Sequence, residues 1–264
     1  MQQEQEKKKY PEPIQKEVTE HPYMLMGKIT VVAFITGILG AKVFHIFEDW
    51  SNFSQDPIDA IFSLSGLTYY GGLICGGLGV IYIANKNGIK PLNMLDAGGS
   101  AMMLAYGVGR LGCHLAGDGD WGIDNLAAKP SWIPQFLWSS KYPHNVLGAD
   151  PGNTIEGCTG PFCNELINPV YPTPLYEIMM CVVLFAVLWS IRKRITVPGV
   201  LFGIYLIMNG FERFMIEKIR VNSLYNIGEF TFTQAEMIAV MLFLSGILGM
   251  VYFTKNKKKY IPTA

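Results

Sequence analysis

Three arginines interrupt otherwise apolar stretches of the chain, and their chemistry is the first feature to explain. Arg110 lies in a glycine-rich run, and Arg213 and Arg220 follow another apolar run together with Glu217. A charge in such a run is costly unless it is paired or hydrated, so it marks a functional site by default. The guanidinium group presents a rigid fork of donors that fits phosphate oxygens. These residues therefore indicate a binding site for a phosphate group.

Further polar and small residues accompany the arginines and complete the candidate site. Arg213, Glu217 and Arg220 recur at helical spacing, which places them on or near one face of a helix. The other residues expected around the phosphate-bearing ligand are Gly71, Gly72, Gly109, Asp118, Asp120, Tyr176, Glu177 and Asn209. The glycines allow a helix or a lipid chain to approach the backbone closely. An alternative, purely structural interpretation pairs Arg213 with Glu217 and Arg110 with Asp118, so that these charges only hold helices together.

His114 is a candidate general base, because imidazole changes its protonation near neutral pH. It directly follows Cys113, and adjacent positions on a helix diverge by about 100°, so the two do not form a catalytic Cys-His pair. The alternative is a structural histidine with a satisfied hydrogen bond. Asp96, near the other end of the same apolar segment, is expected to be a first-turn or helix-packing carboxylate rather than a catalytic one.

The elements that must position these residues are six apolar segments, each close to the roughly 20 residues needed to span a bilayer. They cover residues 24–47, 64–84, 92–115, 175–191, 197–214 and 235–253. Buried helices of a soluble protein are the alternative, but six of them joined by such short basic links would be unusual. The sequence predicts an all-α fold, a polytopic membrane helix bundle of about six transmembrane helices with a loop-rich periplasmic cap.

Basic residues in the short links set the expected orientation, since they favour the cytoplasmic side. They fall in four places, all on one side if the segments alternate: Lys7, Lys8, Lys9, Lys86, Lys90, Arg192, Lys193, Arg194, Lys255, Lys257, Lys258 and Lys259. We therefore expect a cytoplasmic polar tail (1–23), a transmembrane domain (24–254) and a basic cytoplasmic tail (255–264). The segment 116–174, here called the cap, would lie outside, with a short interfacial helix near its tryptophans at 132 and 138.

Composition narrows the function classes. Of the 264 residues half are hydrophobic and only 16% are charged, and the net charge is zero, so no basic face is available for nucleic acid. The five cysteines show no zinc spacing, and we expect neither a metal site nor a cofactor. Cys158 and Cys163 lie in a short polar loop, where a local disulfide and two free thiols are both open.

The pattern of motifs resembles the prolipoprotein diacylglyceryl transferase family. The resemblance runs from about residue 37 to 253 and rests on five short motifs at 70–72, 109–112, 172–177, 213–220 and 232–234. It implies a multi-pass enzyme of the bacterial inner membrane with its active site toward the periplasm. It further implies transfer of diacylglyceryl from phosphatidylglycerol to the lipobox cysteine of a prolipoprotein signal peptide, with release of glycerol phosphate. Arg110 and Arg213 would be the essential arginines, with Tyr70 and His114 as further catalytic candidates.

In such an enzyme the arginines would hold the phosphate and stabilise the charge that builds on the leaving group. A base would help to form the thiolate, which is the nucleophile. The chain departs from the family pattern at Tyr70, where the family has histidine, at Cys113-His114, where it has Asn-Phe, and at Asn209, where it has tyrosine. The family also has seven helices and an outside N-terminus, so the six segments here suggest either a late start of the sequence or a divergent paralogue.

Two other functions compete with the transferase. A non-catalytic phospholipid-binding paralogue would fit the departures at Tyr70 and Asn209. An anion transporter would need polar residues through the full depth of the membrane, yet the inner halves of the segments carry little charge besides Lys28 and Asp96. The resemblance implies phosphatidylglycerol, prolipoprotein signal peptides and the lipid bilayer as the partners.

Overall fold

The computed structural model describes residues 21–62, 68–222, 224–227 and 230–260, and it is mostly helical. The chain divides into two compact units, Met1–Pro91 and Leu92–Ala264. The predicted N-terminal tail lies almost wholly outside the described residues, as does the start of the second apolar segment at residues 64–67.

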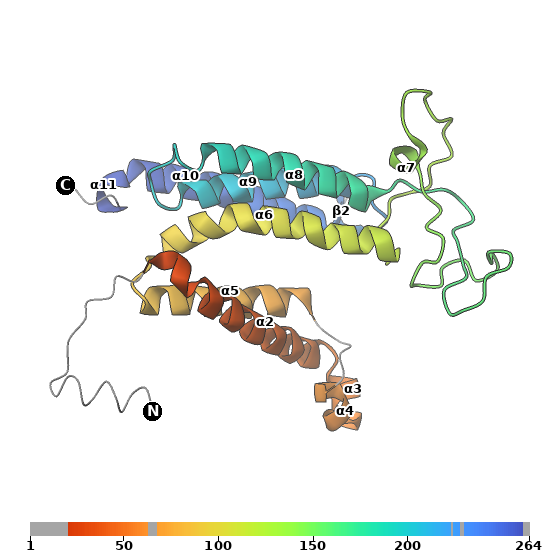
Figure 1. Cartoon of the computed structure of the whole chain (residues 1–264), viewed down its shortest axis with the longest axis horizontal. Coiled ribbons are helices and arrows are strands. Elements are labelled where there is room, and N and C mark those ends of the chain that lie inside the picture. The colour runs from red at the N-terminus through yellow and green to blue at the C-terminus, as the bar shows by residue number, and fades with distance from the viewer. Residues whose placement is uncertain (1–20, 63–67, 223, 228–229, 261–264) are drawn as a thin grey trace, which may run out of the picture. The chain divides into compact units, whose positions relative to one another are not determined.

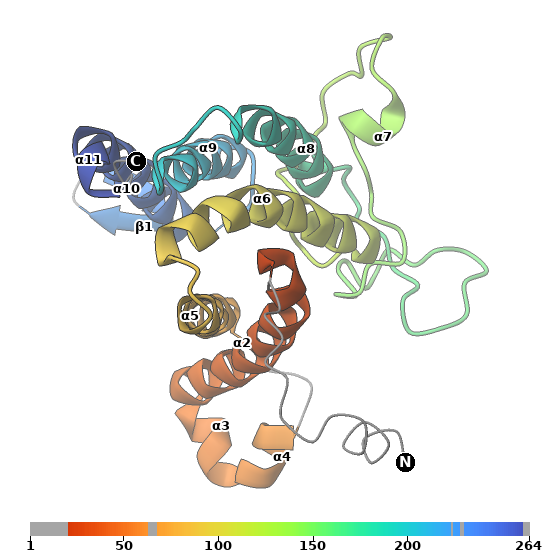
Figure 2. The ribbon, with the colours of Figure 1, turned by 60° about the vertical axis from the view of Figure 1, so that its left-hand side comes forward.

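The first unit is built on two long helices that pack against each other (Figures 1 and 2). Its elements are η1 (Pro22–Leu25), α2 (Met26–Glu48), α3 (Trp50–Gln55), α4 (Pro57–Phe62) and α5 (Tyr69–Lys86). Glycines make the contact between α2 and α5 close. A Cβ atom on Gly40 would lie 2.5 Å from the carbonyl oxygen of Gly71, and one on Gly71 would lie 2.4 Å from that of Gly40. Gly71, a candidate site residue, therefore has a packing role of its own.

The second unit contains four long helices that run side by side, with the cap at one end (Figures 1 and 2). Its elements are α6 (Pro91–Ala116), α7 (Gln135–Trp138), α8 (Thr173–Ile191), α9 (Val200–Glu217), β1 (Leu224–Ile227), β2 (Phe230–Thr233), α10 (Gln234–Lys255) and α11 (Lys257–Tyr260). Apart from α5, the long helices match the predicted segments to within three residues at each end. The expected short helix in the cap is present as α7.

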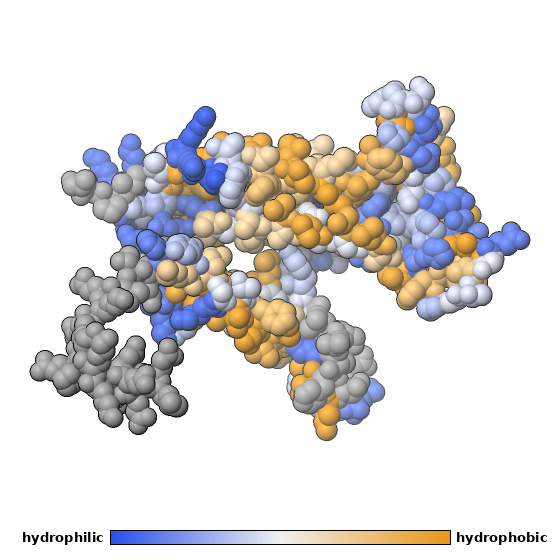
Figure 3. Space-filling model, viewed as in Figure 1, coloured by the Kyte–Doolittle hydropathy of each residue, from blue (hydrophilic) through white to orange (hydrophobic). Residues whose placement is uncertain are grey.

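Three of the described helical stretches are long and apolar enough, by length and composition, to cross a membrane: Tyr23–Glu48, Thr173–Ile191 and Gln234–Lys255. Helices α6 and α9 carry the charged residues of the candidate site, which lowers their mean hydropathy. In Figure 3 hydrophobic residues cover much of the visible face of the long helices, whereas hydrophilic residues gather in the cap and near α11. Leu248 on α10 is 70% exposed and Val183 on α8 is 61% exposed. Apolar exposure of this extent is typical of a surface that meets lipid.

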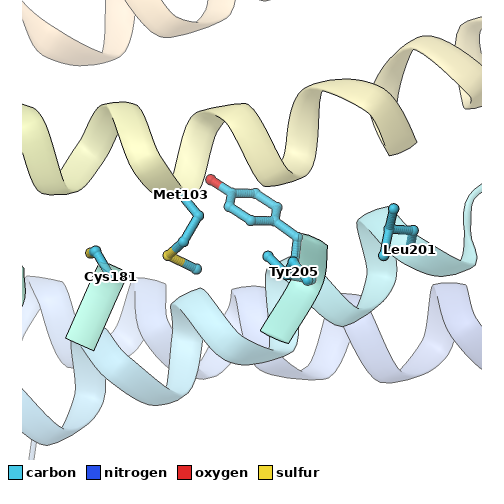
Figure 4. Packing of buried hydrophobic residues seen from close by; sticks show 5 residues of the cluster. Met103, Cys181, Leu201 and Tyr205 are labelled. Atoms are coloured by element: carbon cyan, nitrogen blue, oxygen red, sulfur yellow. The ribbon is translucent and has the colours of Figure 1, made fainter. Parts of the chain in front are cut away.

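The core of the second unit lies where α6, α8 and α9 meet. Met103, Cys181, Leu188, Leu201 and Tyr205 form one buried cluster there. Figure 4 shows Met103 reaching from α6 toward α8 and α9, and the hydroxyl end of Tyr205 directed toward α6. This packing fixes the relative positions of α6 and α9, which carry Arg110 and Arg213 toward the cap, and of α8, which carries Glu177.

Asp96 joins the start of α9 to α6. One of its carboxylate oxygens accepts a hydrogen bond from the backbone N–H of Gly199 at 2.7 Å, and the other accepts one from Phe202 at 2.8 Å. Free N–H groups at a helix N-terminus favour such an anion. The prediction that Asp96 serves helix packing is confirmed by these contacts.

A small β-hairpin is the feature that the all-α expectation missed. β1 and β2 pair antiparallel, with Tyr225 opposite Phe232. Aromatic and β-branched residues such as these favour strands, but the strands are only four residues long and the periodicity over them is too brief to be recognised. Thr233 and Glu236 then form a capping box, which ends the hairpin and begins α10.

The cap has little regular structure and a small core of its own. Tyr142, Leu166 and Val170 are buried in it, and Trp121 packs against them. Cys158 and Cys163 form a disulfide, which decides between the two states that the sequence left open.

Candidate functional site

Glu177 is the central acid of a charged cluster at the cap end of the second unit. Its side chain is fully buried and lies in the first turns of α8. The Tyr106 hydroxyl on α6 donates to it, and Arg110 Nε lies 2.8 Å from Oε2. Arg220 Nη1 lies 3.4 Å from Oε1 and Arg213 Nη1 3.8 Å from Oε2. One carboxylate therefore contacts all three arginines, which the sequence separates by up to 110 residues.

Asp120 in the cap is a second shared acid, and it forms ion pairs with both Arg110 and Arg220. The Thr173 hydroxyl at the start of α8 donates to the Asp120 carbonyl oxygen at 2.7 Å and holds the backbone there. Partial burial of Asp120 opposes ionisation, but the charges of Arg220 and Arg110 outweigh it and lower the pKa of the carboxyl. Asp120 is therefore a stable anion at neutral pH.

A close backbone contact aligns Asp120 with Arg220. Gly122 pairs with Arg220 in an isolated β-bridge, and its N–H donates to the Tyr171 carbonyl oxygen at 2.9 Å. A Cβ atom at position 122 would lie 2.6 Å from the carbonyl oxygen of Ile219. Only glycine permits the cap to approach the chain after α9 so closely.

Arg213 and Glu217 lie one turn apart on α9, with Arg213 Nη2 3.6 Å from Glu217 Oε2. The Asn222 amide donates to the other Glu217 oxygen at 2.6 Å. Some buried polar atoms of the cluster have no hydrogen-bond partner, among them Arg213 Nη1, Arg220 Nε and Glu217 Oε2. Buried donors without a partner are costly, and such atoms call for a ligand.

Cys113, Asp118 and Asp120 present ligand atoms within 4.8 Å of one another, a spacing that a metal ion can use. Asp120, however, is already paired with two guanidinium groups, which would repel a cation. The chemistry of this end of the unit is that of an anion site, because its unpartnered nitrogen donors belong to arginines. The non-bridging oxygens of a phosphate group fit such donors.

Comparison of the sequence with known protein families identifies the family of this chain. The chain matches the prolipoprotein diacylglyceryl transferase family over residues 8–252. It belongs to this family.

Individual relatives agree with this assignment. The phosphatidylglycerol–prolipoprotein diacylglyceryl transferase of Enterococcus faecalis is 28% identical over 226 residues, which cover 83% of this chain and 72% of the relative. The enzyme of the same name from Streptococcus agalactiae is 26% identical, over 84% of this chain and 77% of the relative. That of Corynebacterium glutamicum is 28% identical, over 88% and 70%. The resemblance inferred from the short motifs is thus confirmed.

Within this transferase-family chain, six of the residues selected from the sequence lie in one cluster. They are Arg110, Asp120, Glu177, Arg213, Glu217 and Arg220. The alternative pairing of Arg110 with Asp118 is wrong, since its acidic partners are Asp120 and Glu177. Asp118 instead accepts a hydrogen bond from the Asp120 N–H at 3.3 Å. The pairing of Arg213 with Glu217 is present, but it does not use all the Arg213 donors.

Other selected residues of the second unit have contacts outside the cluster. His114 Nδ1 lies 3.2 Å from the Tyr142 hydroxyl in the cap, the kind of contact expected of a structural histidine. Burial raises the pKa of Tyr142, so its hydroxyl stays protonated. The Tyr176 hydroxyl donates to the Leu137 carbonyl oxygen at 2.6 Å and ties α8 to α7. Asn209 is half-buried one turn before Arg213, and a Cβ atom on Gly109 would meet open space.

Tyr70, Gly71 and Gly72 belong to the first unit, at the start of α5. Tyr70 is 43% exposed there. A Cβ atom on Gly72 would lie 3.4 Å from the Gly37 carbonyl oxygen, so this glycine, like Gly71, serves the contact with α2.

Two residues of the cluster were missed by sequence reasoning. Tyr106 lies one helical turn before Arg110, and this spacing was the available signal, because residues four apart share a helix face. Glu212 directly precedes Arg213 and is 1% exposed. As a second acid in the otherwise apolar sequence around Arg213, it was a signal of the same kind as the arginines.

Proposed function

We propose that the protein transfers the diacylglyceryl group of phosphatidylglycerol to the lipobox cysteine thiol of prolipoproteins and releases glycerol phosphate. Membership of the transferase family and the names of its relatives support this activity. The observation that carries the proposal for this chain is the arginine cluster, in which the buried donors Arg213 Nη1 and Arg220 Nε make no hydrogen bond.

The phosphate of the lipid head group accepts hydrogen bonds from these two donors, and Arg110 contributes the third positive charge. When the thiolate attacks the glyceryl carbon, the carbon–oxygen bond to the phosphate breaks and negative charge grows on the leaving oxygen. Fixed guanidinium groups in a buried site stabilise this charge without reorganising. Glu177 and Asp120 act by positioning, since they hold the three arginines at one place.

The remaining candidates keep the roles proposed from the sequence. Gly71, Gly72, Gly109, Asp118, Tyr176 and Asn209 would shape the surroundings of the head group, and Tyr70 and His114 are the catalytic candidates besides the arginines. The bond of His114 to Tyr142 favours a structural role for that histidine.

The proposed setting is the bacterial inner membrane, crossed six times by α2, α5, α6, α8, α9 and α10. Both tails, 1–23 and 255–264, would be cytoplasmic, and the cap would face the periplasm. The coincidence of these helices with the apolar segments supports this arrangement, as does the distribution of basic residues. Phospholipid head groups of the outer leaflet and signal peptides would then reach the arginine cluster from the bilayer. Nucleic acid is not a proposed partner.

The test uses purified protein with phosphatidylglycerol vesicles and a lipobox peptide, and it measures thioether-linked lipid on the peptide by mass spectrometry. Wild type should lipidate the peptide, and Arg213→Ala should lower the rate by about 100-fold or more, in the range found when one transition-state donor is removed. Arg194→Ala, an exposed arginine between α8 and α9, is the matched control and should keep full activity.

Lipid binding without any lipidation in wild type would refute the transferase and support the non-catalytic paralogue. Equal turnover in Arg213→Ala and Arg194→Ala would refute the phosphate site.

A further inference from the structure

Glu212 is a buried acid for which the reaction just described has no use. It lies on α9 seven residues after Tyr205, so the two side chains occupy the same core-facing stripe of the helix. Figure 4 shows that this stripe faces α6 at Tyr205. Glu212 is 1% exposed, and neither of its carboxyl oxygens has a hydrogen-bond partner.

The neighbours of Glu212 are the charged groups of the cluster itself. It interacts electrostatically with Glu177 on α8 and with the three arginines. Tyr106 on α6 and Cys181 on α8 also interact with it. Lys218, just after α9, is paired with Glu236 at the start of α10 and therefore offers Glu212 no counter-charge.

When Glu212 is left out, the positive and negative charges of the cluster are equal in number. Three guanidinium groups face three carboxylates that each have a cationic partner, those of Asp120, Glu177 and Glu217. Asp118 is exposed and therefore hydrated. The three arginines near Glu212 are already balanced by these acids, so an additional carboxylate without hydrogen bonds would be very costly at such a buried place, whereas a neutral carboxylic acid is tolerated. Protonated, Glu212 also gains an O–H donor, which the ionised form lacks.

We propose that Glu212 is the proton donor of this site, which keeps its proton while the phospholipid binds and gives it to the leaving phosphate oxygen. The inference rests on the proposed function. In the step, sulfur bonds to the glyceryl carbon as the carbon–oxygen bond breaks, and the electron pair of that bond stays on the phosphate oxygen. The proton moves from Glu212 to that oxygen, the thiol proton passes to water, and Glu212 later regains a proton from water.

The protonation state of Glu212 also explains how the anionic phospholipid binds and how the glycerol phosphate leaves. With Glu212 neutral the cluster carries no net charge, and its unpartnered arginine donors can accept the single negative charge of the phosphodiester. Once Glu212 has given up its proton, a bare carboxylate and the glycerol phosphate share one buried place. Their repulsion favours release of the product before Glu212 is protonated again.

The test measures kcat and KM for peptide lipidation as a function of pH, from about pH 6 to about pH 9.5, in wild type and Glu212→Gln. Thiolate formation alone makes the rate rise with pH. If Glu212 must be protonated, wild-type kcat instead falls on the alkaline side. Glu212→Gln should lower kcat by about 100-fold, the usual contribution of a general acid, and should lose the alkaline fall. Its KM for phosphatidylglycerol should change little, because the amide keeps a donor.

Two further variants keep the test decisive. Glu165→Gln, which removes a partly exposed cap acid paired with Lys141 at 3.6 Å, should behave as wild type. Glu212→Asp keeps an ionisable acid and should retain the alkaline fall, even if Glu212→Gln does not fold. A wild-type kcat without an alkaline fall, or a folded Glu212→Gln with wild-type kcat, would overturn the inference. In either case wild-type lipidation persists, whereas failure of the proposed function would abolish it.

Discussion

At the scale of single residues, the cluster is organised by acids shared between arginines. Burying ion pairs costs desolvation that their attraction repays only with good geometry, and apolar packing of the same volume is often as stable. The arrangement around Glu177 is therefore poorly explained by stability alone. It is well explained by ligand binding, because the shared acids hold the guanidinium groups in place and leave some of their N–H donors free for a phosphate.

Asp120 gives this arrangement a measurable pH dependence. Its pKa in the folded protein is lowered below the ordinary value of about 3.9. Its ionised form therefore stabilises the fold fully above about pH 4, and this contribution is lost as pH falls through the lowered pKa. The melting temperature of Asp120→Asn in detergent should be below that of wild type at neutral pH. The difference should shrink on acidification below about pH 4, and a difference that stays constant would contradict the assignment.

The sequence allowed the acids and arginines to be selected, because charges stand out in apolar runs, but not their pairing. Asp118 and Asp120 are two residues apart, and only Asp120 contacts Arg110. Between them Gly119 has φ +95°, and this left-handed conformation turns the chain. Since a sequence without an alignment does not reveal which glycine adopts it, the choice between the two aspartates could not be made.

At the scale of elements, close packing of α9 against α10 positions Arg213. A Cβ atom on Gly246 would lie 2.6 Å from the Gly203 carbonyl oxygen and 2.9 Å from the Ile207 nitrogen. Small residues are the usual means by which membrane helices approach so closely. The backbone of α9 is therefore held against α10 within a few turns of the site.

Two glycines of α10 allow a matched comparison. Gly246→Ala should destabilise the protein by about 1–3 kcal/mol, because the new methyl group meets backbone atoms that cannot move freely. Gly249→Ala should be neutral or slightly stabilising, since its Cβ atom would come no closer than 3.8 Å to Phe253 and alanine favours the helix. Unfolding in denaturant, monitored by circular dichroism, measures both. Equal stabilities of the two variants would show that the α9–α10 contact has room for a methyl group at position 246.

The long helices could be predicted from the sequence and the cap could not. A run of about 20 apolar residues carries its own signal. The cap is held by pairings distant in sequence, such as that between Ser140 and Val170, and by turns at Tyr142 and His144 with positive φ. No local pattern encodes such contacts. The hairpin at β1 and β2 was missed for a different reason: its pairing is local, but each strand has only four residues and is too short to show a period.

At the scale of the whole molecule, the oxidation state of each cysteine bears on the proposed membrane orientation. Cys158 and Cys163 in the cap are joined, whereas Cys75, Cys113 and Cys181 on the helices are free thiols. Disulfides persist in the periplasm but not in the reducing cytoplasm. A periplasmic cap therefore agrees with the distribution of basic residues.

This distribution of thiols predicts a labelling pattern. In protein extracted from cells into denaturant without reductant, a maleimide should modify only Cys75, Cys113 and Cys181. Reduction should add Cys158 and Cys163, and mass spectrometry resolves the two states. A variant carrying both Cys158→Ser and Cys163→Ser should give the same mass before and after reduction. Full modification of wild type before reduction would place the cap in the cytoplasm.

The bond between Asp96 and the start of α9 has a consequence for biosynthesis. Its two partners, Gly199 and Phe202, are synthesised more than 100 residues after it. At about 5–20 residues per second, Asp96 waits roughly 5–20 s for them on the ribosome. In the proposed six-span arrangement, the Asp96 carboxylate of α6 would have no partner during that interval. We expect α6 to enter the lipid stably only after α9 has emerged, so that the arginine site is assembled last.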